Sequence, residues 1–329
     1  MCAIIKSGRI PKWKKYPLFH GSKVNPQNIL VTGATGFIGQ SLCRELIKNG
    51  DNVIVLSRQH EKAENLFGSH VHIVTNLEQL DSNTNLNAVI SLAGASVVAG
   101  LWTKKRKQLL LDSRINDLNA IKALCDRLKT KPEVLINASA IGFYGIRHDE
   151  LITEKETSQK IFQSELCQAR EDAATQFDEY GIRVCNLRIG LVFDNDGGAF
   201  VQMARPVKFG LGAVFGSGKQ WMSWIYKPDL IRIILFLLSQ EHMSGAINAT
   251  APEPVTNEMF TKKVAAKFHR PVFFKVPAFV LKVMLGELSQ LFLEGQRVIP
   301  EKLLAASFHF KVNTLDEMLT AIDVKESIK

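Results

Sequence analysis

Short apolar runs alternate with longer amphipathic stretches along residues 28–190. The apolar runs at 29–32, 52–57, 70–74, 88–92, 134–138 and 183–187 predict strands. The stretches at 40–50, 102–128 and 164–180 place Leu and Ile at helical spacing and predict helices. Strands that are apolar throughout and are separated by helices indicate a parallel sheet covered on both faces. We therefore predict an α/β fold, a doubly wound parallel sheet of the Rossmann type.

The pattern changes after residue 190. Glycine-rich segments at 194–198 and 210–218 predict loops, and helices are expected at 229–239, at 257–268 and through most of the tail from Pro277. We predict a basic N-terminal extension at 1–27, a Rossmann domain at 28–190 and a smaller, mainly helical substrate lobe at 191–329, with later segments free to return to the sheet. The apolar stretches at 231–238 and 277–293 are too short or too interrupted to span a membrane, and we interpret them as buried helices.

Three glycines mark the turn between the first strand and the first helix. Gly33 permits a tight turn, Gly36 lets the backbone approach a pyrophosphate, and Gly39 lets helix and strand pack closely. The helix N-terminus then offers unpaired N–H groups and a positive dipole to phosphates. The alternative is a purely structural turn, but the strand before, the helix after and the second strand about 20 residues later favour dinucleotide binding.

The end of the second strand indicates which dinucleotide is bound. NAD sites usually place Asp or Glu there to bind the ribose 2′-hydroxyl, whereas this chain has Ser57 and Arg58. A guanidinium would bind a 2′-phosphate, which a carboxylate would repel. We predict NADP(H) as the cofactor; the alternative for Arg58 is an ordinary surface charge.

The net charge of +9 is concentrated in the first residues of the chain. Residues 1–27 hold six basic residues and no acidic one, which leaves +3 for the rest, so the body is not a basic nucleic-acid-binding domain. This arm either binds an acidic surface or is a solvated extension. The five cysteines include no Cys-x-x-Cys pair, so we expect a reducing, cytoplasmic location and no metal site. Because the apolar runs are too short to span a membrane, we also expect no membrane partner.

The assembled motifs resemble the extended short-chain dehydrogenase/reductase superfamily. More narrowly, the chain resembles its NAD(P)-dependent epimerase-like branch, which carries a C-terminal segment of unassigned function. The resemblance runs from about Ile29 to Ile322, and its markers are TGATGFIG at 32–39, NAVISLAGA at 87–95, SAIGFYG at 139–145, LRIGLV at 187–192, GSGKQWMSWI at 216–225, NATAPEPVTN at 248–257 and LEGQRVIP at 293–300.

The resemblance implies a set of cofactor-binding residues. The pyrophosphate would lie on the glycine-rich loop, the 2′-phosphate on the end of the second strand, the adenosine along the fourth strand and the nicotinamide near the turn after the sixth. These positions are Gly33, Thr35, Gly36, Phe37, Ile38 and Gly39; Ser57 and Arg58; Leu92, Ala93 and Gly94; and Val192. Arg114 either reaches the cofactor as well or is a surface charge on a helix. The resemblance also implies a small-molecule substrate and a homodimer paired through the helices at 102–128 and 164–180.

The family's Ser/Thr–Tyr–Lys triad is missing where the resemblance would place it. Counting back from Glu171 puts the Lys position at Cys167 and the Tyr position at Gln163, and the hydroxyl position is Ala140. No Tyr-x-x-x-Lys occurs anywhere in the chain. Without the cation, a phenol has nothing to lower its pKa, and glutamine has no useful acid–base pKa.

Substitutes for the triad are few. Tyr144, with Ser139 nearby, is our candidate catalytic pair, although this Tyr is usually structural in the superfamily. Cys167 is either a thiol facing the cleft or a small buried apolar residue. The stretch 221–226, with Lys227 and Asp229, either lines a substrate pocket or packs between the lobes.

Two functions from different classes follow. The first is an NADP-dependent oxidoreductase or nucleotide-sugar epimerase-like enzyme with a non-standard proton donor. The second is a catalytically weak, NADPH-sensing regulator that contacts a partner. Nucleic-acid binding through the arm is a distant third, whose signature would be a steep salt dependence.

Overall fold

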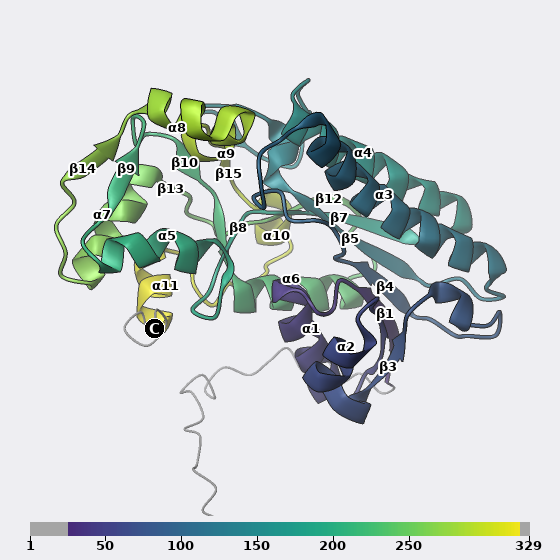
Figure 1. Ribbon diagram of the computed structural model, residues 1–329. Coiled ribbons are helices and arrows are strands. Elements are labelled where there is room, and N and C mark those ends of the chain that lie inside the picture. Colours follow the sequence, from purple (N-terminus) through teal and green to yellow (C-terminus); the bar gives the residue numbers. More distant parts are fainter. Residues whose placement is uncertain (1–25, 323–329) are drawn as a thin grey trace, which may run out of the picture.

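A seven-stranded, all-parallel sheet forms the centre of the molecule in the computed structural model, which describes residues 26–322 (Figure 1). The predicted basic arm lies almost wholly outside these residues. The strand order is β12-β7-β5-β4-β1-β2-β3, and the predicted Rossmann-type fold is confirmed. The strands are β1 (Asn28–Thr32), β2 (Asn52–Leu56), β3 (Val71–Val74), β4 (Ala88–Ser91), β5 (Val134–Ala140), β7 (Arg183–Ile189) and β12 (Gly245–Ala249).

Alternate residues of the strands enter two separate cores. In β1, Ile29 and Val31 pack against the helices of one face, and Leu30 packs against those of the other. The first face carries α1 (Phe37–Lys48), α2 (His60–Phe67) and α6 (Lys227–Ser239), and the second carries α3 (Lys104–Arg127) and α4 (Phe162–Thr175). This two-sided burial explains why most strand residues are apolar, whichever face of the sheet they point to.

The sheet continues beyond the predicted boundary at residue 190. Strand β12 pairs in parallel with β7, from Gly245 opposite Cys185 to Ala249 opposite Ile189, and α6 packs on the α1 face of the sheet. The segment is short and contains Asn248, so its apolar pattern is too weak to predict a strand. The N-terminal unit therefore includes residues that the sequence analysis placed in the C-terminal lobe.

The remaining elements build a smaller lobe beside the carboxyl ends of the strands (Figure 1). Its aromatic core centres on Phe193, Phe200, Trp224 and Phe260, and the Phe193 and Trp224 rings stack at 5.7 Å. The elements are β6 (Leu151–Ile152), β8 (Leu191–Phe193), α5 (Gly198–Lys208), β9 (Ala213–Phe215), β10 (Trp221–Met222), β11 (Trp224–Tyr226), β13 (Val255–Thr256), α7 (Asn257–Lys267), β14 (Phe274–Val276), α8 (Ala278–Leu285), α9 (Gln290–Leu293), β15 (Arg297–Val298) and α11 (Leu315–Ala321). Helix α10 (Glu301–Ala305) packs instead on the core of the large sheet, through Leu303.

The two apolar stretches that were interpreted as buried helices differ. Helix α6 is buried along most of its length, as predicted. Helix α8 has no buried residue, and its Phe279 and Val283 are exposed, so the interpretation of 277–293 was wrong for this helix. Helix α8 is apolar enough to lie in a core, but only one side of the helix packs against the lobe. Within residues 26–322, no helix combines the length and hydropathy required to cross a bilayer.

Candidate functional site

Each glycine of the β1–α1 turn has a different spatial requirement. Gly33 has φ of +71°, and a Cβ there would lie 2.7 Å from the backbone of Leu92 and Ala93. A Cβ on Gly39 would lie 2.3 Å from the carbonyl oxygen of Gly33, so α1 and β1 approach as closely as two backbones can. A Cβ on Gly36 would meet only that same oxygen, at 3.1 Å. Gly36 therefore leaves its outer side open.

Among residues 26–322, the first amides of α1 have no hydrogen-bond partner. Gly36 occupies the N-cap, no described side chain caps the helix, and the first turn holds no acidic residue. The side-chain amide of Gln40 donates a hydrogen bond to the carbonyl of Thr35 at 3.0 Å. Unpaired N–H groups and the helix dipole at an open glycine form an anion site. This cradle, formed by Gly33, Gly36, Gly39 and the first turn of α1, therefore fits a pyrophosphate; that the amides of Phe37 and Ile38 bind it stays a prediction.

The two residues after β2 have different surroundings. The Ser57 hydroxyl is buried, donates to the carbonyl of Gln59 at 3.1 Å and accepts from its amide at 3.2 Å, which closes a local turn. Arg58 is exposed and pairs with no carboxylate among residues 26–322. The turn presents Arg58 at the edge of the sheet beside β1. Ser57 positions the turn, and the 2′-phosphate contact predicted for it stays a prediction.

A buried arginine shapes the end of β4. Arg170 of α4 donates to the carbonyls of Ser91 and Ala93 at 2.9 and 2.8 Å, and its Nε donates to Asn137 at 2.8 Å. Asp117 of α3 accepts from the hydroxyls of Thr32 and Ser91 at 2.8 and 2.6 Å, and burial raises its pKa. These contacts fix the backbone of Leu92, Ala93 and Gly94 next to the glycine-rich loop.

Arg114 lies over this same backbone. Its guanidinium carbon would be 3.4 Å from a Cβ placed on Gly94, and its Nη1 donates to the carbonyl of Leu110 at 2.9 Å. Burial lowers its pKa, and it has no carboxylate partner among the residues that the structure describes. Arg114 is thus a half-buried cation at the carboxyl end of the sheet, which favours cofactor or substrate contact over an ordinary surface charge.

The segment after β8 folds back onto the glycine-rich loop. The ring of Phe37 lies 3.1 Å from a Cβ placed on Gly197 and 2.6 Å from one placed on Gly198, and the latter would also meet the carbonyl of Val192 at 2.8 Å. The Lys227 ammonium lies 4.4 Å from the centre of the Phe37 ring. It also pairs with Asp194 and Asp196, at 2.9 and 2.5 Å. The predicted nicotinamide contact of Val192 therefore adjoins the predicted pyrophosphate loop.

The positions of the missing Tyr and Lys face the turn after β5. A Cβ on Gly142 would lie 3.7 Å from the Cys167 sulfur and 3.8 Å from the Cβ of Gln163. Gln163 is 6% exposed, and its Oε1 has no hydrogen-bond partner in the described part of the chain. Burial raises the pKa of the Cys167 thiol to about 11. Neither side chain can exchange a proton readily near neutral pH.

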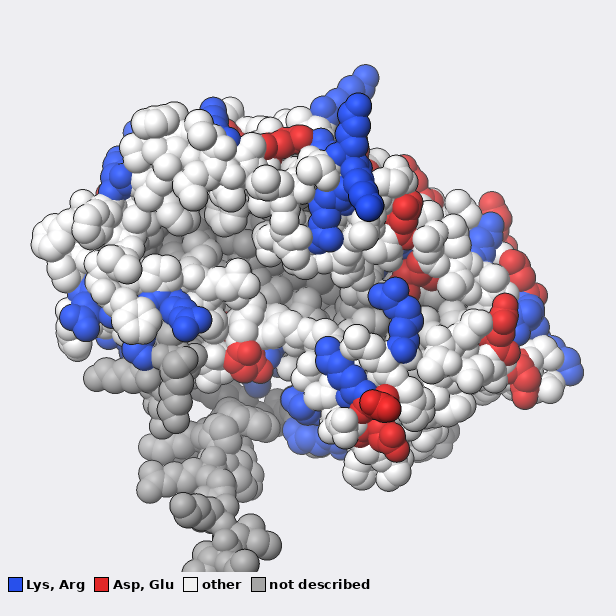
Figure 2. All heavy atoms as spheres, viewed as in Figure 1, with Lys and Arg blue, Asp and Glu red and all other residues white. Residues whose placement is uncertain are grey.

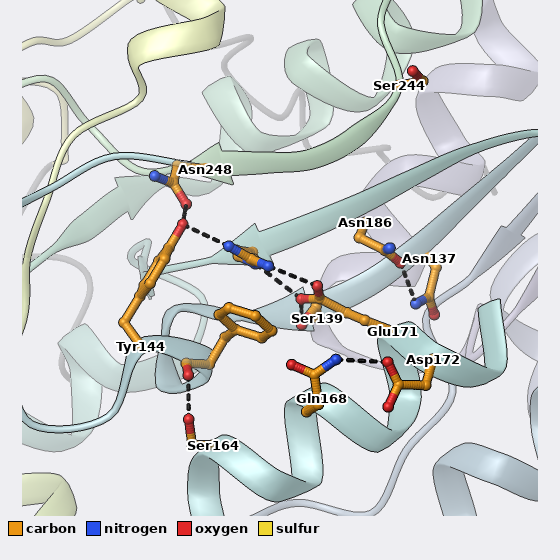
Figure 3. Close-up of polar contacts among 12 residues, drawn as sticks. Asn137, Ser139, Tyr144, Ser164, Gln168, Glu171, Asp172, Asn186, Ser244 and Asn248 are labelled. Carbon is orange, nitrogen blue, oxygen red and sulfur yellow. Dashed lines mark hydrogen bonds and ion pairs between the residues drawn. The ribbon is translucent and has the colours of Figure 1, made fainter. Parts of the chain in front are cut away.

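The two predicted catalytic side chains belong to one buried polar network (Figure 3). The Ser139 hydroxyl donates to Glu171 at 2.6 Å, and Glu171 accepts two bonds from Arg188, at 3.0 and 2.8 Å. Nη1 of Arg188 donates to the Tyr144 oxygen at 3.0 Å, and the Tyr144 hydroxyl donates to Asn248 at 2.6 Å. Asn248 in turn donates to the carbonyl of Ile299 at 3.0 Å.

This network gives Tyr144 a fixed structural environment. The residue is 0% exposed, and burial raises its pKa to about 12, against which Arg188 acts only in part. Ser139 is also buried, and its hydroxyl proton is held by Glu171. The catalytic role predicted for this pair stays a prediction, and the burial of both side chains disfavours it. The sequence analysis missed Arg188 and Asn248 as the partners of Tyr144.

The stretch 221–226 and Asp229 contribute mainly to packing. Trp224 is buried against Phe193, and the Asp229 carboxylate accepts from the backbone of Lys311 and Val312 and pairs with Arg232. These contacts favour the packing alternative over a pocket lining. Among residues 26–322, no group of three or more His, Cys, Asp or Glu side chains is arranged to hold a metal ion.

A parallel sheet with an open glycine cradle at its carboxyl edge defines a dinucleotide-binding protein of the Rossmann class. The sequence comparison then gives the particular family. The model of the NAD dependent epimerase/dehydratase family matches residues 29–249, and the chain belongs to this family. Residues 276–322 match a second model, a domain of unknown function called DUF1731.

Proteins that are similar to this chain over most of its length occur in bacteria and humans. The chain is 36% identical over 297 residues to the epimerase family protein YfhF of Bacillus subtilis, covering 90% of this chain and 97% of that one. It is 38% identical over 293 residues to the epimerase family protein SSP1921 of Staphylococcus saprophyticus, covering 87% and 95%. The structure of the human epimerase family protein SDR39U1 with NADPH is similar, with a TM-score of 0.79, 26% identity and coverage of 91% and 99%.

Proposed function

We propose that this protein binds NADPH in the cradle of Gly33, Gly36 and Gly39 and acts as an NADP-dependent oxidoreductase on a small molecule. The observation that carries the proposal is the open N-terminus of α1, whose first amides have no partner in the described part of the chain. An anion with two phosphates satisfies these amides and matches the positive end of the helix dipole. The NADPH named in the structure of the human relative supports the same cofactor.

The selection of NADPH over NADH is assigned to Arg58. It is exposed at the end of β2 and lacks a carboxylate partner among the described residues, so it is available to a 2′-phosphate. No Asp or Glu occupies this strand end to bind a 2′-hydroxyl. The turn that Ser57 closes follows β2, which is the neighbour of β1 in the sheet.

The proposed chemistry is hydride transfer, which the nicotinamide supplies when the cofactor is bound. The chain contributes binding and orientation through the glycine-rich loop, the Leu92–Gly94 backbone and Arg114. At the family's Tyr and Lys positions it offers Gln163 and Cys167, and the Cys167 pKa of about 11 makes that thiol a weak acid. We therefore propose that the reaction does not use a Tyr–Lys pair, and that it is slower than a triad-catalysed one.

The first test is a titration of the full chain with NADPH, NADP and NADH. We expect tight NADPH binding and weaker NADH binding. The Arg58→Ala variant should weaken NADPH binding by about tenfold to a hundredfold, the range for a lost charge-assisted contact, and leave NADH unchanged. Lys62→Ala, which removes an exposed cation from α2, is the matched control and should change neither affinity.

Two outcomes would contradict the proposal. Equal affinity for NADPH and NADH would show that Arg58 does not select the cofactor. Failure to bind any dinucleotide would show that the protein does not use this class of cofactor. A screen of carbonyl compounds and nucleotide sugars with NADPH follows, in which turnover supports the enzyme. Nucleotide-sugar epimerisation is the alternative reaction in that screen.

A second candidate function is NADPH sensing without catalysis. It is favoured by the burial of Tyr144 and by the uncharged Gln163 and Cys167 in place of the acid–base pair. A sensor must change its binding to a partner with the redox state of the cofactor. Pull-down with NADPH and with NADP would distinguish the functions: different partner recovery in the two samples supports the sensor, and identical recovery together with measurable turnover eliminates it.

A further inference from the structure

The outer end of the C-terminal lobe carries a set of exposed large apolar side chains. Phe273 is 81% exposed and Val283 is 83% exposed, values at which almost the whole side chain meets water. Single exposed apolar residues are ordinary, but a cluster of this size marks an interaction surface. We call this cluster the outer face; its apolar members are Phe209, Leu211, Phe273, Phe274, Phe279, Val283 and Met284.

Strand pairing brings the segments that carry these residues together. Strand β14 pairs in parallel with β9, with Phe274 opposite Ala213, so Leu211 lies just before the same end of the pair. Nε of Arg270 donates to the carbonyl of Lys208 at 3.1 Å and joins the start of this segment to the end of α5. Helix α8 follows β14 directly, and a Cβ placed on Gly216 after β9 would lie 3.7 Å from the Ala278 side chain.

Positive charge predominates around the outer face. Residues 261–286 include six basic residues and no acidic one, and residues 198–226 include three basic residues and no acidic one. Glu287, two residues after α8, pairs with Lys107, and Glu258 pairs with Lys262. Lys263 pairs with Asp316. Within residues 26–322, Lys267, Arg270 and Lys282 have no carboxylate partner. In Figure 2 the surface over α8 and β14 is mostly uncharged, with Lys and Arg atoms and some Asp or Glu atoms at its margin.

This charge distribution indicates what kind of partner the outer face can bind. A second copy of the chain would bring the same cations against each other across an apolar contact, which disfavours self-association through this surface. An anionic occupant is complementary. On α8, Phe279 and Val283 are one turn apart on the same side, with Lys282 beside them, and all three side chains are exposed.

We propose that the outer face binds the surface of an anionic lipid bilayer. The exposed Phe, Val and Met side chains enter the boundary between head groups and acyl chains, and Lys267, Arg270 and Lys282 remain among the lipid phosphates. The aliphatic stems of these cations are long enough to follow the apolar side chains inward. The proposal gives a role to α8, which lies in the domain of unknown function, and it is independent of the proposed oxidoreductase activity.

The proposal departs from the sequence-based expectation of no membrane partner. Hydropathy along a chain detects segments long enough to span a bilayer. The outer face is assembled from the end of α5, β14 and α8, and each of these is short. Such a surface can be recognised only in the folded structure, where strand pairing brings its segments together.

The test is co-sedimentation of the full chain with lipid vesicles. One preparation is phosphatidylcholine alone, and the other has a third of its lipid replaced by phosphatidylglycerol. We expect binding to the anionic vesicles at low salt, reduced binding at high salt, and little binding to phosphatidylcholine alone. The arm of residues 1–25 is present in every variant, so differences between variants report on the outer face.

Two variants separate the apolar and the ionic contribution. Phe279→Ser with Val283→Ser should reduce binding by about tenfold or more, because it removes two inserted side chains. Arg270→Gln with Lys282→Gln should reduce it by about 25-fold, since each cation near such a surface contributes about a factor of five. The controls are Leu304→Ser and Lys62→Gln, an exposed apolar residue and an exposed cation outside the outer face, which should bind like the unmodified chain.

Several results would overturn the proposal. They are no binding to anionic vesicles, equal binding to both preparations, or unchanged binding in both double variants. Sedimentation velocity supplies a further check: a dimer that the Phe279→Ser and Val283→Ser changes dissociate would show that a second copy covers the surface. Each of these measurements can be made whether or not the protein binds NADPH.

Discussion

The glycine cradle and the turn after β5 lie at the same edge of one sheet, yet they retain the family pattern to different degrees. At the cradle, Gly33, Gly36 and Gly39 give the backbone the shape that a pyrophosphate requires. At the turn, the positions expected for Tyr and Lys are Gln163 and Cys167, and Tyr144 is enclosed by Arg188 and Asn248. Dinucleotide binding relies mainly on backbone groups, whereas proton transfer relies on the pKa of particular side chains. A chain can therefore keep the first while it changes the second.

The buried network also shows what occupies the changed region. Glu171 and Arg188 are both more than nine-tenths buried, and they pair through two hydrogen bonds. The Arg188 guanidinium also lies 3.3 Å from the centre of the Phe143 ring. These contacts hold η4 (Ile141–Tyr144) against β7 and α4. The region has a structural function of its own, and this function can be tested separately from the cofactor.

Breaking the buried ion pair should have the largest effect on stability. Arg188→Met leaves the Glu171 carboxylate buried without its cation, and we expect the free energy of unfolding to fall by about 3 to 5 kcal/mol. Urea denaturation measures the change. Adding Glu171→Gln should recover part of the loss, because the uncompensated charge is removed. NADPH affinity of the folded fraction should stay within about threefold; a parallel loss of affinity would show that cradle and network are one unit.

Filling the cradle should have a smaller effect on stability and a decisive one on binding. Gly33→Ala combines a left-handed φ with a Cβ that meets the Leu92–Ala93 backbone, so we expect a loss of about 2 to 4 kcal/mol and no detectable dinucleotide binding. Gly181→Ala is the matched control, with a φ of +72° and open space around the new Cβ. It should cost about 1 to 2 kcal/mol and leave binding unchanged. Similar losses of stability in both variants would show that the left-handed φ alone causes the loss. The close approach of the Leu92–Ala93 backbone would then contribute nothing.

The pH dependence of thiol reactivity gives the smallest and most specific test. Burial raises the pKa of Cys167 to about 11, so the thiolate is scarce at neutral pH and its population rises as the pH approaches 11. Alkylation of the Cys167 peptide, followed by mass spectrometry, should accelerate from pH 7 to 10 without reaching a plateau. Arg114→Met should slow it further, because that cation favours the thiolate. A plateau near neutral pH would reveal a reactive thiolate and restore Cys167 as a catalytic candidate.

The cradle could be predicted from the sequence because its determinants are local. Gly33, Gly36 and Gly39 lie within seven residues, and the strand before them and the helix after them have clear periodicity. The same holds for the positions of Gln163, Cys167 and Glu171, which share one helix. In each case the neighbours in space are also neighbours in the chain.

The partners of Tyr144 could not be predicted, because they depend on register. Arg188 and Asn248 are 44 and 104 residues away, and they reach Tyr144 only because β7 lies between β5 and β12. The periodicity of β12 was too weak to reveal a strand, so the Asn248 contact had no basis in the sequence. For α8, hydropathy indicated burial, but only the packing of the lobe determines which side of a short apolar helix is covered.

The contact from Asn248 to Ile299 has a consequence for how the two matched family regions relate. Asn248 lies in the first region, near its end, and Ile299 lies in the second. Beside it, β15 pairs with β6, and Ser223 donates to the carbonyl of Gln296 at 2.7 Å and accepts from the amide of Val298 at 2.8 Å. A chain that ended before residue 276 would leave these buried groups unpaired. We therefore expect the two regions to unfold together as one cooperative unit, although sequence families divide them.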